Sequence, residues 1–243
     1  LSINVLKWIP NHGSETFLCL HNLPRSHSWA SSIFRLPGIY YLKHAFDIAT
    51  LMAFTVPILY GIPAFFLIAV VLLQRRLWPG FELVGRFDTK LLGLGVSAVV
   101  LAYLIEVAVV LHLGLGREFQ MSMLGFGLTT AQYWLMIGSV LVLPPIVEEL
   151  AFRTFLLQAL PFNKHWAVAT VAIFLSAGCF MWAHIGIYQL WTTHALMFTL
   201  GMIFAVGRVM TRGVVYSMIL HSVAVACALV LNYAGEVLGW SGW

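Results

Sequence analysis

Length, composition and charge already exclude most classes of soluble protein. The chain has 243 residues, of which 61% are hydrophobic and 9% charged, whereas charged residues make up about 25% of an ordinary soluble domain, so we expect an integral membrane protein. The formal net charge of +4 comes from short basic clusters between apolar runs, and this pattern excludes a nucleic-acid-binding protein.

The first element, residues 1–43, mixes aromatic and basic side chains. Trp8 and Trp29 alternate with basic residues such as Lys7 and Arg25, a composition typical of segments that lie at the lipid headgroup boundary. We predict an interfacial N-terminal arm over residues 1–43 and an all-α transmembrane helical bundle over residues 44–243.

About six apolar stretches follow, each near the roughly 20 helical residues that cross a bilayer core of about 30 Å. They are residues 48–73, 91–116, 130–143, 166–187, 191–209 and 214–233. Pro57 and Pro63 predict a kink in the first stretch, because each proline removes a backbone donor. Pro144 and Pro145 predict the end of the third stretch and the start of a new helix, since proline fits the first turn of a helix.

The basic residues predict an orientation in the membrane. Lys and Arg concentrate in residues 75–90, 153–164 and 208–212, which alternation of the spans places on one face, and the positive-inside rule makes this face cytoplasmic. The basic residues of the arm would then lie on the opposite side, which leaves the orientation of the arm open. No internal repeat or linker divides the chain, so one domain is expected.

Ionisable side chains inside a span are costly and usually face a bundle interior or a water-filled cavity. The candidates are Glu148, Glu149, Arg153, His184 and His221. On a helix, Glu149 and Arg153 meet on one face as an ion pair, and Glu148, about 100° away, is left for another partner. Glu106, in the second span, either lines a cavity or pairs with a cation.

The depth of these residues decides whether they can meet. From the turn at residues 162–165, Glu148 lies ~21 Å back along one helix and His184 ~28 Å forward along the next, at 1.5 Å per residue. His221 lies ~14 Å from Arg212, and helix tilt can close the remaining gap. We expect the three groups to meet near the middle of the membrane, where they can transfer protons. The alternative is a structural role for each.

These residues belong to three ordered motifs. Residues 148–153 read EExxxR, residues 180–184 read FxxxH, and His221 follows Arg212-Gly213 in the last span. In this order the set resembles the CAAX protease and bacteriocin-processing family, which comprises the intramembrane type II prenyl endopeptidases and their bacterial relatives. The resemblance covers about residues 130–232.

The resemblance implies a glutamate-dependent intramembrane endopeptidase, in which Glu148 and His184 activate a water that attacks a peptide carbonyl. By the same matching, His221 helps to hold the oxyanion, while Glu149, Arg153 and Phe180 support the site. The implied partners are the lipid bilayer and a membrane-associated peptide or protein, and the implied location is a bacterial inner membrane. No cofactor is expected, although ligation of a metal or a pigment by the histidines stays open.

One position departs from the family pattern. The family carries an Asn or another polar residue four positions after the third-motif histidine, and this chain has Val225 there. Losing one oxyanion donor can cost about 10²–10³ in rate, and Asn232 lies ~16 Å from His221 along the helix, too far to replace it. The alternative function is therefore that of a catalytically degenerate member serving as a structural or assembly subunit of a larger membrane complex.

Overall fold

The computed structural model describes residues 48–77, 83–122, 124, 127–163 and 165–240, so the predicted arm at residues 1–43 lies outside the described residues. The described chain is all-helical. Its elements are α4 (Ile48–Leu77), α5 (Thr89–Leu113), α6 (Phe119–Ser122), α7 (Thr130–Glu149), the π-helix η1 (Leu150–Leu156), α8 (Trp166–Ala183), α9 (Trp191–Thr211) and α10 (Val214–Leu238). Six candidate membrane spans lie in this part, with α7 and η1 forming one of them. The predicted multi-pass helical bundle is confirmed.

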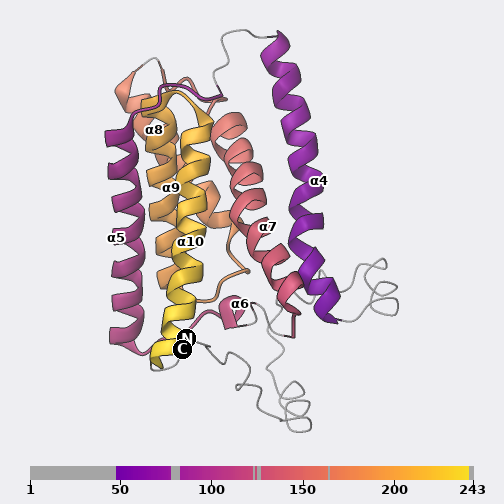
Figure 1. The fold of residues 1–243 in the computed structure, drawn as a ribbon. Coiled ribbons are helices and arrows are strands. Elements are labelled where there is room, and N and C mark those ends of the chain that lie inside the picture. The colour runs from indigo at the N-terminus through magenta and orange to yellow at the C-terminus, as the bar shows by residue number, and fades with distance from the viewer. Residues whose placement is uncertain (1–47, 78–82, 123, 125–126, 164, 241–243) are drawn as a thin grey trace.

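The helices form one bundle with α4 and α5 at its opposite edges (Figure 1). α7 packs against α4 and α10, α10 packs against α5 and α9, and α9 packs against α8. The largest cluster of buried apolar residues lies where α5, α8, α9 and α10 meet, and its members include Val99, Tyr103, Phe180, Phe204 and Leu220. Large apolar side chains on the outside, such as Phe65 and Trp166, are exposed in the structure, as expected for surfaces that face lipid.

The prediction that the third span ends at Pro144 and Pro145 is wrong, because α7 continues through both prolines to Glu149. In an α-helix the two prolines deprive only the carbonyls of Val140 and Leu141 of their donors. Packing of α7 against α4 and α10 stabilises the helix across this gap, as neighbouring helices commonly do inside membranes.

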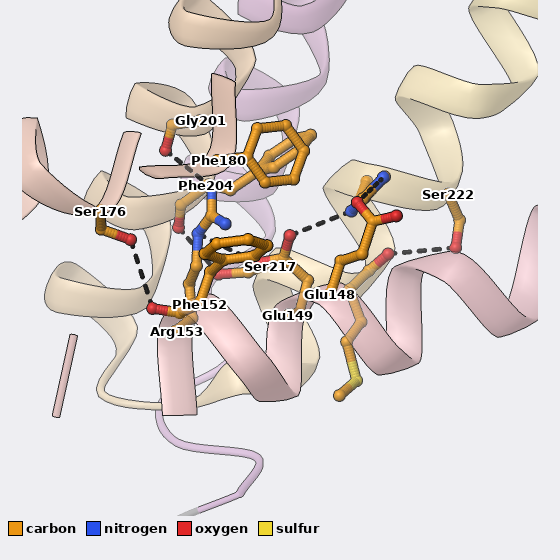
Figure 2. Close-up of polar contacts among 12 residues, drawn as sticks. Glu148, Glu149, Phe152, Arg153, Ser176, Phe180, Gly201, Phe204, Ser217 and Ser222 are labelled. Atoms are coloured by element: carbon orange, nitrogen blue, oxygen red, sulfur yellow. Dashed lines mark hydrogen bonds and ion pairs between the residues drawn. The ribbon is translucent and has the colours of Figure 1, made fainter. Parts of the chain in front are cut away.

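After Glu149 the helix widens into the π-helix η1. The backbone N–H of Leu157 donates to the carbonyl of Phe152, five residues earlier, at 3.0 Å. The hydroxyl of Ser176 on α8 donates to the same carbonyl at 3.2 Å (Figure 2). Wide turns of this kind are frequent at functional sites, and η1 carries the buried side chain of Arg153.

The basic loop between α4 and α5 lies against the basic turn between α9 and α10. The N–H of Arg86 donates to the carbonyl of Thr211 at 2.7 Å, and the N–H of Val214 donates to the carbonyl of Leu83 at 2.8 Å. The two basic segments therefore share one end of the bundle, and the cytoplasmic location of that end stays a prediction.

The close contact between the α4–α5 loop and the α9–α10 turn depends on glycine, which leads to a first testable expectation. A Cβ at Gly213 would overlap the backbone of Val84, and a Cβ at Gly85 would overlap the carbonyl oxygen of Thr211. Gly213→Ala is expected to lower the free energy of unfolding by about 1–3 kcal/mol, because backbone cannot yield as a side chain can. In the control Gly93→Ala, where a Cβ meets nothing within 4 Å, stability should rise by up to about 1 kcal/mol.

Equilibrium unfolding in mixed detergent micelles measures both changes. Equal stability of the two alanine variants would contradict a tight contact between the two loops.

Candidate active site

Three of the predicted residues, from three different helices, lie together inside the bundle. Glu148 is near the end of α7, His184 follows the last residue of α8, and His221 is in the middle of α10. Oε2 of Glu148 lies 3.8 Å from Nε2 of His184 and 3.8 Å from Nε2 of His221. The side chains of Glu148 and His184 are each 13% exposed and that of His221 is 9% exposed, so the group is enclosed without being sealed.

The 3.8 Å separations are suited to a bridging water. They exceed the length of a direct hydrogen bond, but a water at about 2.8 Å from each group of a pair fits between them. Within the described chain, no group donates a hydrogen bond to Oε2 of Glu148, although this oxygen is buried. The carboxylate can therefore accept a proton from a water held against either imidazole.

The hydrogen bonds of the two histidines decide which ring nitrogen faces Glu148 with a lone pair. Nδ1 of His184 lies 2.7 Å from the carbonyl oxygen of Phe180, and Nδ1 of His221 lies 3.0 Å from Oε1 of Glu149. A carbonyl and an ionised carboxylate only accept, so Nδ1 carries the proton in both rings. Each neutral ring then presents Nε2 as an acceptor toward Glu148, and each protonated ring presents a donor there.

Glu149 and Arg153 form the predicted ion pair and are completely buried. Oε2 of Glu149 lies 3.3 Å from Nε of Arg153, and both side chains are 0% exposed. Nη2 of Arg153 donates to the carbonyl oxygen of Gly201 on α9 at 2.9 Å (Figure 2). The other carboxylate oxygen of Glu149 accepts from His221. One carboxylate thus connects a buried cation on η1 to an imidazole on α10.

Phe180, the predicted supporting residue of the second motif, packs against three of these side chains. Its ring centroid lies 4.7 Å from that of His184 and 5.7 Å from that of His221, and the Arg153 guanidinium carbon lies 4.7 Å from the same centroid. A cation over an aromatic face is attracted by the ring quadrupole. Phe180 therefore fixes both histidine rings and contributes to holding the buried arginine.

Three further residues contact the site and were not predicted from the sequence. Phe204 on α9 stacks on His221 at 5.0 Å between ring centroids. Tyr188, between α8 and α9, stacks on His184 at 5.9 Å with 7° between the ring planes. Burial, with the negative charges of Glu148 and Glu118 adding to it, raises the pKa of Tyr188 to about 12, so its hydroxyl keeps its proton.

The third unpredicted residue is Tyr60 on α4, whose hydroxyl donates to Oε1 of Glu148 at 3.2 Å. All three residues are aromatic side chains in an aromatic-rich chain with 8 Tyr and 17 Phe. The position of Tyr60 between Pro57 and Pro63 was a visible signal of irregular helix, but not of a contact with the first motif.

Val225 lies one turn beyond His221 on α10 and is partly buried. Asn232, farther along the same helix, lines a separate cavity of about 80 Å³ together with Glu106 and Glu118. Of the two alternatives for Glu106, the structure therefore shows the lining of a cavity. The carboxylate of Glu118 accepts hydrogen bonds from the backbone N–H groups of residues 189 and 190 at the start of α9.

The Nδ1 atoms of both histidines contact protein oxygens. Over the described ranges, no group of three or more His, Cys, Asp or Glu residues is found as a candidate metal site.

Comparison with known proteins gives one result for this chain. No curated protein and no solved structure matches it. One family model matches the chain, over a segment that begins with α7 and ends within α10. This segment contains all three motifs but excludes α4. Residues 130–227 match the family described as Type II CAAX prenyl endopeptidase Rce1-like, which confirms the resemblance that the three motifs predicted.

Proposed function

We propose that the protein is an intramembrane endopeptidase that hydrolyses a membrane-associated peptide or protein, acting in a bacterial inner membrane. The observation that supports this most directly is the position of Glu148 Oε2, at 3.8 Å from Nε2 of both His184 and His221. A carboxylate and two imidazoles at this spacing can hold and deprotonate one water.

In the proposed reaction Glu148 is the general base. Its carboxylate takes a proton from the water while the water oxygen forms a bond to the substrate carbonyl carbon, and Nε2 of neutral His184 accepts the second hydrogen bond of the same water. The tetrahedral intermediate then expels the amine. The proton that Glu148 took passes to the leaving nitrogen as the C–N bond breaks, so that the carboxylate returns to its starting state.

His221 would stabilise the oxyanion in its protonated form. Nδ1 of His221 is held by Glu149, so only the imidazolium has a second proton on Nε2 to donate to a developing negative charge. Glu149 stabilises this cation and is itself paired with Arg153. In this proposal Glu149 and Arg153 support the positive charge of His221 as well as its position.

Val225 favours a second candidate function. A valine side chain offers no hydrogen bond at the position where the family carries a polar residue, and one lost oxyanion donor costs about 10²–10³ in rate. A member without catalysis would keep the bundle and serve as a structural or assembly subunit of a larger membrane complex.

One experiment separates the two functions. The purified protein is incubated with a library of membrane-embedded peptides in H₂¹⁸O, beside Glu148→Gln, Glu106→Gln and Val225→Asn. The wild type and Glu106→Gln, the matched intramembrane control, should release products that carry one ¹⁸O in each new carboxylate. Glu148→Gln should be slower by about 10²–10⁴-fold, and Val225→Asn should be faster, because its amide restores a donor.

A different result would support the second candidate function. Absence of cleavage in every variant, Val225→Asn included, together with stoichiometric co-purification of other membrane proteins by wild type and Glu148→Gln alike, would replace the enzyme by the assembly subunit.

A further inference from the structure

Tyr60 is the residue outside the family segment that touches the proposed general base. It lies on α4, and its hydroxyl donates to Oε1 of Glu148 at 3.2 Å. The two oxygens of this carboxylate therefore have different surroundings, since Oε2 faces His184 and His221. Along the described chain, Tyr60 is the only side chain that donates a hydrogen bond to Glu148.

A glutamate carboxylate needs such a contact to keep one orientation. Its terminal torsion is broad, so that the carboxylate plane rotates easily in the absence of a directional partner and can turn both oxygens away from the imidazoles. A hydrogen bond to an ionised group is worth more than one between neutral groups. The Tyr60 hydroxyl can thus hold Oε1 on the α4 side and leave Oε2 toward the imidazoles.

The fold brings α4 close enough to supply this hydroxyl. α4 packs against α7, and the neighbouring Gly61 lies where an added Cβ would be 3.9 Å from Cδ1 of Leu143 on α7. Pro57 and Pro63 flank Tyr60 within the same helix, and each removes one backbone donor on either side of it. Tyr60 therefore lies next to the glycine at which α4 approaches α7, the helix that carries Glu148.

We propose that Tyr60 is a positioning residue that holds the Glu148 carboxylate with Oε2 directed at His184 and His221. The effect of Tyr60 on catalysis rests on the proposed endopeptidase function, whereas its effect on the orientation of the carboxylate does not. A helix outside the matched segment would then complete the catalytic group.

The test compares Tyr60→Phe with Tyr216→Phe. Both changes remove one hydroxyl from a tyrosine ring, which is partly buried at Tyr60 and buried at Tyr216, but the Tyr216 hydroxyl has no hydrogen-bond partner among the residues described. Tyr60→Phe is expected to lower kcat about tenfold with KM changed less than about twofold, as loss of a charge-assisted hydrogen bond predicts. Tyr216→Phe should change neither quantity.

A second measurement does not depend on activity. The ¹⁵N NMR chemical shifts of the His184 and His221 imidazoles, measured at one pH, should change in Tyr60→Phe and stay as in wild type in Tyr216→Phe, since the rings face the carboxylate that Tyr60 holds. If the wild type cleaves no peptide but these chemical shifts respond, the endopeptidase function fails and the positioning role stands. If wild-type cleavage is established and Tyr60→Phe alters neither kcat nor the imidazole chemical shifts, the positioning role is overturned.

Discussion

Replacing Arg153 by methionine is expected to lower the free energy of unfolding by about 3–5 kcal/mol, the range for breaking a buried ion pair on one side. The Glu149 carboxylate would keep its 0% exposure and lose the guanidinium 3.3 Å away. Among the residues that the structure describes, His221 would then be the one ionisable partner left to the carboxylate, at 3.0 Å. The change also removes the hydrogen bond to the Gly201 carbonyl and the cation packed over Phe180.

Reversible unfolding in mixed micelles measures this loss, and Arg76→Met, at an exposed arginine at the end of α4, is the control that should change stability by less than about 0.5 kcal/mol. The double variant Glu149→Gln with Arg153→Met should recover a large part of the loss, because neither charge then remains buried alone. A single variant as stable as the wild type would mean that the ion pair does not stabilise the junction of η1, α9 and α10.

The second large effect is expected on cleavage, from His184→Phe. Phenylalanine keeps a ring between Phe180 and Tyr188, where His184 now packs, but it has no nitrogen to face Glu148. We expect the rate of peptide cleavage to fall by about 10²–10⁴-fold. Stability should fall by only about 1 kcal/mol, through the lost hydrogen bond to the Phe180 carbonyl.

His112→Phe is the matched control, because His112 is an exposed histidine in the last turn of α5. Cleavage rates measured on the same membrane peptide, beside unfolding curves for both variants, separate chemistry from folding. Wild-type cleavage by His184→Phe would remove this residue from the activation of water.

The spans were predictable because a lipid environment makes the signal simple. Any helix that crosses a bilayer needs about 20 apolar residues whatever its neighbours are, and the apolar stretches of the sequence correspond to the six candidate spans. The behaviour of Pro144 and Pro145 was not predictable in the same way. Proline propensity is a local property, whereas the continuation of α7 depends on its contacts with α4 and α10.

The site was predictable only where charge or motif spacing marked it. Glu148, His184 and His221 are ionisable residues in apolar helices, so each was conspicuous, and helix rise gave their depths. Their roles in catalysis stay predictions. Tyr60, Tyr188 and Phe204 gave no such signal, because an aromatic residue in a membrane helix packs equally well against lipid, against another helix or against an imidazole.

The packing of α5 has a consequence for synthesis of the protein at the ribosome. α5 packs mainly against α9 and α10, and its buried residues Val99, Tyr103 and Val107 face partners from the last third of the chain. α10 begins about a hundred residues after α5 ends, which is a delay of about 5–20 s at a translation rate of roughly 5–20 residues per second. During that time α5, with Glu106 in its middle, resides in the membrane without its final neighbours. An insertase or chaperone that shields this helix would act in that interval, before Glu148, His184 and His221 can come together.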